Sequence, residues 1–239
     1  MTTPDTPRRR IALIHALEES VAPIRAAFQS HWPEAYAFDL LDTSLAVDRA
    51  HAGSLDAAMM KRFASLTEYA MSADGLAGRA EGILFTCSAF GPAIDAVKAR
   101  FHIPILRPNE AAFEQAIKLG RSIGLAVTFG PSEASLRTEL EHMAAARGHK
   151  IEVRSVFVED ALDALKSGDG YGHDVRVAEA VRQFDDVDVV VLGQFSMARA
   201  AEKARDVVSA PVLTTPEASV RAIRSRLTQG AAPQIHSPR

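Results

Sequence analysis

The sequence predicts an α/β protein with a Rossmann-like arrangement, in which helices flank parallel strands. Two observations lead to this prediction. Short apolar runs alternate with amphipathic stretches along the chain, as a parallel sheet with helical crossovers requires. The second half also repeats the order of elements of the first, which indicates two similar lobes. The chain has 239 residues, of which 47% are hydrophobic, so it can build a core in each lobe.

The expected elements of the first half are strands at 11–15, 37–41, 82–85 and 103–106, with helices at 21–29, within 55–80 and at 93–101. The second half predicts strands at 124–128, 151–158, 187–192 and 211–213, with helices at 177–184 and 198–208. Between them, the glycine-rich stretch 168–174 contains His173 and predicts a flexible loop that could act as a lid.

The repeat is clearest where residues 83–108 align with residues 190–215 without a gap, at a constant offset of 107 positions. Only three aligned residues are identical, but strand, turn, helix and short strand fall in the same register. We therefore expect two pseudo-symmetric lobes and loose ends: 10–108 plus 214–229 as the first lobe, 109–213 as the second, and flexible tails at 1–9 and 230–239.

Composition excludes several classes of protein. A net charge of −3 gives no reason to expect nucleic acid or an anionic membrane as a partner. A single cysteine excludes an internal disulfide framework and a cysteine-rich zinc site, and the histidines and carboxylates lack metal-ligand spacing. Glycine-rich phosphate-binding motifs are missing, so neither a metal nor a nucleotide cofactor is expected. No apolar stretch is long enough for a membrane span, and we expect a cytoplasmic protein.

The single cysteine, Cys87, follows the strand 82–85 and precedes a helical pattern. Backbone N–H groups and the dipole of a following helix point at such a turn and can lower the pKa of a thiol. The alternative is a buried structural cysteine, since free cysteine behaves as a small hydrophobic residue.

The segment Thr86-Cys87-Ser88-Ala89 resembles the first cysteine motif of the aspartate/glutamate racemase superfamily, which includes hydantoin racemases, maleate isomerase and arylmalonate decarboxylase. The segment 190–194 resembles the second motif, with Gln194 where cysteine would be. The resemblance covers about residues 10–225. It implies two lobes with the active site in the cleft between them, and in the racemases one thiol from each lobe on opposite sides of the substrate carbon.

Gln194 cannot take up a proton at neutral pH, so the symmetric two-thiol mechanism is unavailable. Three hypotheses about the function remain. The first is a racemase or isomerase that moves a proton at the carbon next to a carboxylate, with Cys87 on one face and His15, which titrates near neutrality, as a second acid/base. The second is a decarboxylase in which Cys87 protonates an enediolate. The third is a two-lobed small-molecule binding protein without catalysis.

The resemblance also implies contacts to a small carboxylate substrate. Near Cys87 they are Thr86, Ser88 and Ala89, whose N–H groups could bind a carboxylate or an enediolate. In the second lobe they are Thr128, Ser132, Gln194, Phe195 and Ser196, although the hydroxyls could equally be helix caps. Arg107 could pair with an anionic substrate, and an apolar pocket of Phe90, Phe129 and Phe195 would favour decarboxylation. A homodimer or higher homo-oligomer is expected.

Overall fold

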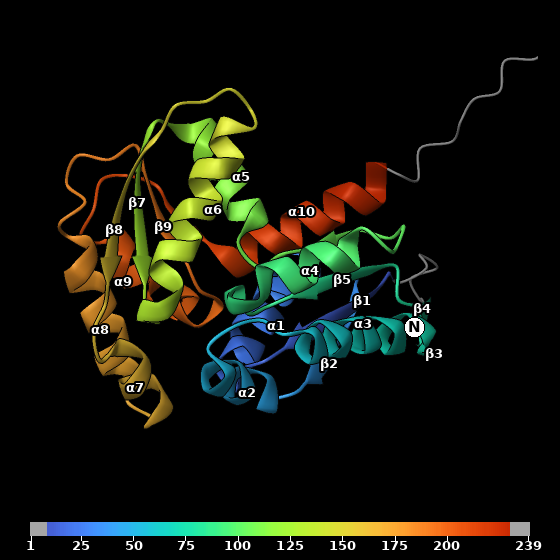
Figure 1. Ribbon diagram of the computed structural model, residues 1–239. Helices are drawn as coiled ribbons and strands as arrows, with labels where there is room; N and C mark the ends of the chain where they lie inside the picture. Colours follow the sequence, from blue (N-terminus) through green and yellow to red (C-terminus); the bar gives the residue numbers. More distant parts are fainter. Residues whose placement is uncertain (1–8, 230–239) are drawn as a thin grey trace, which may run out of the picture.

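Two parallel sheets with the same strand order form the framework of the protein (Figure 1). The computed structural model describes residues 9–229. The first sheet has the order β2-β1-β5-β6 and the second the order β10-β9-β7-β8. Strands β1, β2, β5 and β6 correspond to β7, β8, β9 and β10, so each lobe has the same topology. The predicted α/β class and the two-lobed repeat are confirmed.

Lobe one consists of β1 (Arg10–His15), η1 (Glu18–Ser20), α1 (Val21–His31), β2 (Tyr36–Leu41), α2 (Ser44–Ala52), α3 (Ala57–Ser72), the hairpin β3 (Asp74–Gly75) and β4 (Gly78–Arg79), β5 (Gly82–Phe85), η2 (Ser88–Phe90), α4 (Gly91–Lys98) and β6 (Ile105–Leu106). Here η denotes a 3-10 helix. All six residues of β1 are buried, because helices cover both faces of the sheet.

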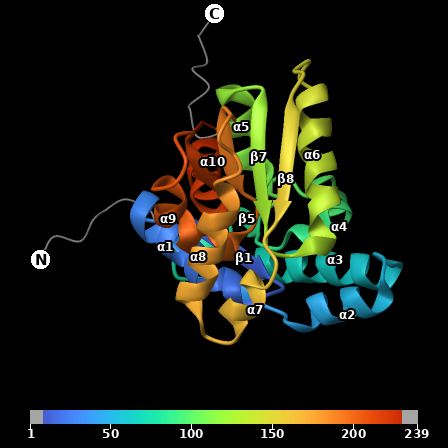
Figure 2. The same ribbon diagram turned by 90° about the vertical axis from the view of Figure 1, so that its left-hand side faces the viewer.

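Lobe two consists of α5 (Glu110–Leu119), β7 (Ser122–Val127), η3 (Gly130–Ser132), α6 (Glu133–Ala145), β8 (Glu152–Phe157), α7 (Ala161–Lys166), α8 (Gly170–Val181), β9 (Val189–Leu192), η4 (Phe195–Ala200), α9 (Ala201–Arg205) and β10 (Val212–Thr214). The last helix, α10 (Thr215–Gln229), packs against α1 of lobe one and α5 of lobe two. Figure 2 shows the second sheet above lobe one, with β7 and β8 pointing towards it.

The gapless alignment of the two halves is confirmed by the strand ends. Strands β5 and β9 begin and end at aligned residues, and a 3-10 helix starts three residues after each. Cys87 and Gln194 both precede that 3-10 helix in extended backbone, with φ values of −119° and −136°. The two residues therefore occupy equivalent positions in the two lobes.

One local prediction is wrong. The glycine-rich stretch 168–174 is not a lid, because it forms the start of α8: the Asp169 side chain caps this helix by accepting a hydrogen bond of 2.8 Å from the Gly172 N–H. His173 is fully buried there, 2.8 Å from Asp174. The stretch 55–80 is helical only as α3 and ends in the β3–β4 hairpin. The predicted tails lie outside the described residues, apart from Arg9, which pairs with Glu81.

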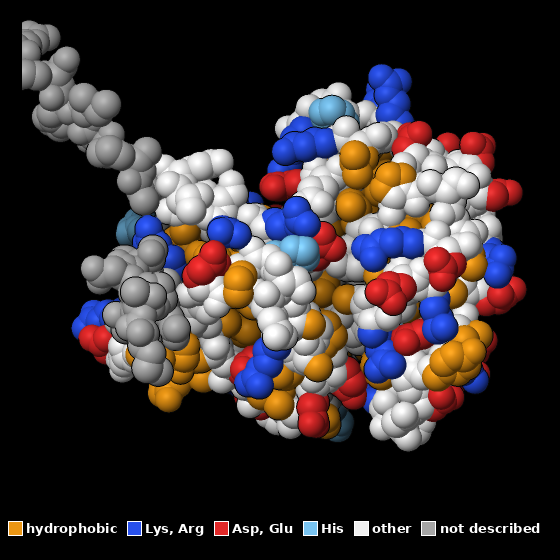
Figure 3. Space-filling view, turned by 180° about the vertical axis from the view of Figure 1, so that it is seen from behind, with side chains coloured by type: hydrophobic (Ala, Val, Ile, Leu, Met, Phe, Trp, Pro, Cys, Tyr) orange, Lys and Arg blue, Asp and Glu red, His pale blue; other side chains and the backbone are white. Residues whose placement is uncertain are grey.

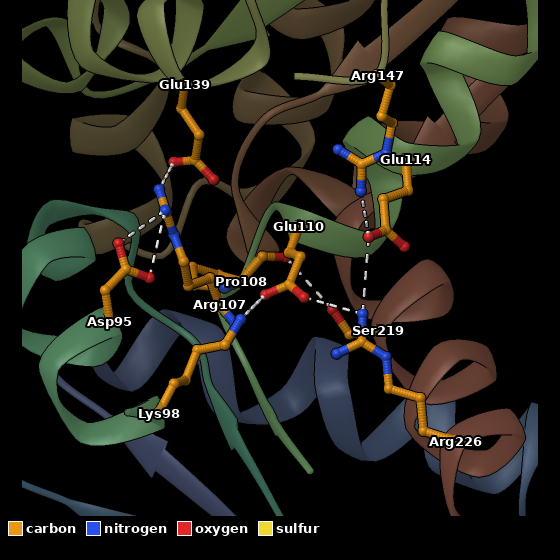
Figure 4. Close-up of polar contacts among 10 residues, drawn as sticks. All are labelled: Asp95, Lys98, Arg107, Pro108, Glu110, Glu114, Glu139, Arg147, Ser219 and Arg226. Carbon is orange, nitrogen blue, oxygen red and sulfur yellow. Dashed lines mark hydrogen bonds and ion pairs between the residues drawn. The ribbon is translucent and has the colours of Figure 1, made fainter. Parts of the chain in front are cut away.

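Ion pairs of Arg107 join the two lobes close to where the chain passes from β6 of lobe one to α5 of lobe two (Figure 4). The guanidinium of Arg107, which follows β6, lies 3.1 Å from Asp95 on α4 and also pairs with Glu139 on α6 of lobe two. Burial raises the pKa of Glu139, although the positive charge of Arg107 opposes that shift. Arg107 is therefore already paired with carboxylates of both lobes and is not free to bind a substrate in this arrangement.

Glu110, the first residue of α5, links this helix to α4 and α10 through ion pairs (Figure 4). Its carboxylate lies 2.5 Å from Lys98 on α4 and 2.8 Å from Arg226 on α10. Beside it, the Ser219 hydroxyl on α10 donates a 3.3 Å hydrogen bond to the Pro108 carbonyl. Burial opposes ionisation of Glu110, but hydrogen bonds and charge from Lys98 and Arg226 outweigh it and hold the pKa of this carboxyl below its usual range.

Acidic and basic side chains are interspersed over the rear face of the molecule (Figure 3), in keeping with the small net charge of −3. Within residues 9–229, no helix combines the length and the apolar character needed to cross a membrane.

We expect Glu110→Gln to lower the free energy of unfolding by about 1.5 kcal/mol at pH 7, because Lys98 loses its carboxylate partner and Arg226 keeps only Glu114, at 3.7 Å. A carboxyl whose pKa is depressed on folding stabilises above its unfolded pKa of about 4.3, and this contribution is lost as the pH falls further. Urea unfolding between pH 3 and pH 7 measures both effects.

The matched control is Glu141→Gln, which breaks an exposed pair with Arg137 inside α6. It should change the free energy of unfolding by less than about 1 kcal/mol at every pH. Equal effects of the two variants would contradict the role assigned to Glu110.

Candidate active site

The residues predicted for the site lie at the carboxyl ends of the central strands. His15 ends β1, Cys87 follows β5, Thr128 follows β7 and Gln194 follows β9. Parallel strands bring their carboxyl ends to one edge of each sheet, where ligands of open α/β folds bind. The turns of the two lobes also meet, since η1 of lobe one contacts η4 of lobe two.

Cys87 is half-buried and borders a narrow void that has no room for a water molecule. The void is lined by Ile14, His15, Ala16, Leu45, Phe63, Phe85 and Cys87. All of these residues belong to lobe one, so this void is not a cleft between the lobes.

The pKa of Cys87 is raised, not lowered as its place at a turn suggested. Burial raises this pKa to about 11, and a hydrogen bond from the Ala89 N–H offsets only part of the shift. The α-helix itself begins at Gly91, after an intervening 3-10 turn, so its first N–H groups are not at the sulfur. At neutral pH the side chain is a thiol and therefore a proton donor.

His15 lies in a buried hydrogen-bond network beside the thiol. Its Nδ1 is 2.9 Å from the Thr86 hydroxyl and 3.1 Å from the Ser20 hydroxyl, and these two hydroxyls are 2.9 Å apart. On the other side of the ring, Nε2 is 3.0 Å from Asp39, which in turn accepts a 2.8 Å hydrogen bond from Arg25. The network connects β1, β2 and the residue that immediately precedes Cys87.

The side chain of His15 is enclosed by the protein. It is fully buried and both ring nitrogens already have partners. Burial lowers the pKa of His15 in spite of the nearby Asp39 carboxylate, so the ring is neutral at pH 7. The contacts of His15 are with Thr86, Ser20 and Asp39, and its part as a second acid/base stays a prediction.

Gln194 is hydrogen-bonded within its own lobe. Its Oε1 accepts hydrogen bonds from the Thr128 N–H at 2.6 Å and from the Thr128 hydroxyl at 2.8 Å. Its Nε2 donates to the Ser132 hydroxyl at 3.2 Å, and that hydroxyl donates to the Phe129 carbonyl. Gln194 thus joins the turns after β7 and β9, and the three polar residues predicted there do come together.

The remaining predicted contacts are divided between the core and the site. Phe195 and Phe90 are not pocket residues, because both are buried in lobe one: Phe195 packs with Ile11 and Leu84, and Phe90 with Phe63. Ser196 is also buried, whereas Ser88 and Ala89 are half-buried beside Cys87. Of these five predicted residues, only Ser88 and Ala89 are partly exposed.

The sequence did not single out Ser20, Asp39 or Asn109. Ser20 ends η1 as Ser132 ends η3, and each hydroxyl donates to the carbonyl three residues earlier, so the repeat could have identified it. Asp39 is the one charged residue of β2, a signal in an otherwise apolar strand. No sequence pattern marks Asn109 as a site residue. Its buried amide donates a 2.6 Å hydrogen bond to the Gly193 carbonyl.

Within the described chain, no three His, Cys, Asp or Glu side chains are grouped as metal ligands. His102 lies at the opposite, amino-terminal edge of the first sheet, where it lines a surface pocket with Arg79 and Leu227.

Several solved racemases have this architecture. Glutamate racemase isoform RacE1 from Bacillus anthracis matches with a TM-score of 0.69 at 13% identity, over 95% of this chain and 84% of that one. Aspartate racemase from Picrophilus torridus matches at 0.68 and 12%, over 92% and 94%. Allantoin racemase from Klebsiella pneumoniae matches at 0.65 and 19%, over 96% and 91%. The fold is that of the two-lobed racemases.

The sequence profile of the Asp/Glu/hydantoin racemase family matches residues 18–223. The protein belongs to this family, which places it among racemase-type enzymes. No curated protein sequence matches the chain.

Because the pKa of Cys87 is about 11, we expect its alkylation by iodoacetamide to accelerate about tenfold per pH unit from pH 7 to pH 10. Mass spectrometry reports this site alone, since the chain has one cysteine. Glutathione, measured in parallel, should reach its plateau at least one pH unit earlier. A plateau below pH 8 for Cys87 would contradict the assignment of a protonated thiol.

Asp39→Ala should lower the free energy of unfolding by about 1.5 to 3 kcal/mol, because it leaves a buried ring nitrogen of His15 unpaired. Asp39→Asn keeps an acceptor and should recover part of the loss. Asp48→Ala, which removes an exposed partner of Arg62, is the control and should change stability by less than about 1 kcal/mol. Urea unfolding at pH 7 measures all three, and equal losses for Asp39→Ala and Asp48→Ala would contradict the network.

Proposed function

We propose that this protein is a cofactor-independent isomerase that exchanges a proton at the carbon next to a carboxylate of a small acid or amino-acid-like substrate, with Cys87 as the proton-transferring group. The observation that supports this most is the place of the single thiol. Cys87 lies at the carboxyl end of β5, at the sheet edge where the site turns gather, and its raised pKa keeps it protonated. Membership of the racemase family supports the same class of reaction.

In this reaction solvent hydroxide removes the α-proton and becomes water, and the electron pair of the C–H bond moves onto the carboxylate to form an enediolate. The S–H bond of Cys87 then breaks: its proton goes to the α-carbon and its electron pair stays on sulfur as a thiolate, which regains a proton from water and regenerates hydroxide. The N–H group of Ser88 is the donor assigned here to the charge that develops on the enediolate, because the Ala89 N–H already donates to Cys87. Gln194 has no titratable group, so the base on the other face lies outside the lobe-two turn.

Decarboxylation is the second candidate, and one observation favours it. The position equivalent to Cys87 is filled by Gln194, an amide already engaged by Thr128 and Ser132. Loss of CO₂ leaves the electron pair of the C–C bond on the remaining carboxylate as an enediolate. Cys87 protonates that carbon, and the thiolate regains its proton from water. This sequence needs only one acid.

Incubation of amino acids, hydantoins and malonates with the protein in D₂O separates these reactions. Deuterium at the α-carbon without CO₂ release indicates isomerisation, and CO₂ release indicates decarboxylation. Cys87→Ala should lower either rate by at least about 100-fold, since a positioned acid or base contributes that much. The surface variant Glu141→Gln should retain full activity. Activity that survives Cys87→Ala would refute the proposed function.

A further inference from the structure

Two exposed aromatic side chains, Phe129 and Phe157, border the lobe-two part of the site; we call them the aromatic wall. Phe129 directly follows Thr128, which is bonded to Gln194. Phe157 is the last residue of β8. Its ring packs over Gly130, so that a Cβ atom added to this glycine would lie 3.5 Å from the ring. The two residues are 40% and 42% exposed. Both therefore lie at the carboxyl edge of the second sheet, around the same turn.

Burying two phenylalanine side chains would stabilise the fold, so their exposure at this edge calls for an explanation. The other aromatic residues predicted for a pocket, Phe90 and Phe195, are buried in the core and are unavailable to a ligand. The aromatic wall is the apolar surface that remains beside the polar groups of Thr128, Ser132 and Gln194. Apolar walls with a few placed hydrogen-bonding groups are typical of small-molecule sites.

The charges around this edge argue against a substrate with a second carboxylate. The turns 86–90, 128–132 and 193–197 contain neither lysine nor arginine. Two exposed acids, Glu159 and Asp160, follow the aromatic wall after β8. Arg107, which follows β6, is already paired with carboxylates of both lobes. A side-chain carboxylate of the substrate would meet like charges here instead of a cation.

We propose that the aromatic wall receives an aryl or bulky alkyl substituent on the α-carbon of a monocarboxylate substrate, and that the site discriminates against dicarboxylates. This inference rests on the proposed function, because it assumes that the substrate lies between Cys87 and the lobe-two turn. The single carboxylate is bound by the neutral N–H and hydroxyl donors of Ser88, which is half-buried beside Cys87. The substituent lies against Phe129 and Phe157.

Protection of Cys87 from alkylation tests this inference without requiring turnover. The probes are propanoate, 3-phenylpropanoate and glutarate. Propanoate has one carboxylate on a short chain, 3-phenylpropanoate adds a phenyl group, and glutarate adds a second carboxylate. We expect 3-phenylpropanoate to protect at a concentration at least tenfold below that of propanoate, and glutarate to protect no better than propanoate. Phe129→Ala and Phe157→Ala should each raise the concentration of 3-phenylpropanoate needed by roughly fivefold to tenfold and leave that of propanoate unchanged.

Leu119→Ala is the matched control, since Leu119 is 51% exposed but precedes β7 at the opposite edge of the same sheet. It should leave all three probes unaffected, and thermal unfolding confirms that each variant is folded. If propanoate protects but the phenyl group adds nothing, or if glutarate protects better, the aromatic wall is refuted and the proposed function stands. If no probe protects and no deuterium is exchanged, the proposed function fails and this inference fails with it.

Discussion

The side chain of Phe195 fixes the relation between the two halves of the site. It belongs to the turn of lobe two that follows Gln194, yet it is only 2% exposed and packs among Ile11, Leu13 and Leu84 on the first sheet. A buried phenylalanine is worth about 1.5 to 3 kcal/mol of apolar burial, enough to hold a short turn in place. The Gln194 turn is thereby attached to the same strands that carry His15 and Cys87, so the lobes do not act as independent units at this point.

The two half-sites share a backbone but differ in chemistry. In lobe one, buried hydroxyls and a neutral imidazole surround a thiol that burial keeps protonated. In lobe two, the equivalent position holds an amide whose hydrogen-bonding groups serve its own turns. The protein thus combines a near-symmetric framework with different side chains at the two equivalent positions.

The sequence predicted the framework well because buried parallel strands are short apolar runs, and the turns that follow them are marked by small polar residues. The ends of β5 and β9, and with them the places of Cys87 and Gln194, followed from the gapless repeat. Helix α8 was missed at its start because glycines at 168, 170 and 172 suggest a loop, whereas the cap formed by Asp169 outweighs their weak helix propensity.

The contacts within the site were harder to predict. Thr86 and His15 are 71 positions apart, and their hydrogen bond depends on the pairing of β5 with β1. Asp39 reaches the same ring from β2. The raised pKa of Cys87 depends on how deeply the side chain is buried, which residue order alone does not show. Phe90 and Phe195 follow strands as pocket residues would, and only the packing of the helices places them in the core.

The bonding of Gln194 has a consequence for how such an enzyme can change. Replacing this amide by cysteine would not by itself recreate a pair of facing thiols. The substitution would remove the acceptor of both the Thr128 N–H and its hydroxyl, and the donor to Ser132. Those groups are nearly buried, so leaving them without hydrogen-bond partners would destabilise the turn. A cysteine at this position would therefore call for compensating changes at Thr128 and Ser132, whose hydrogen bonds now depend on the amide.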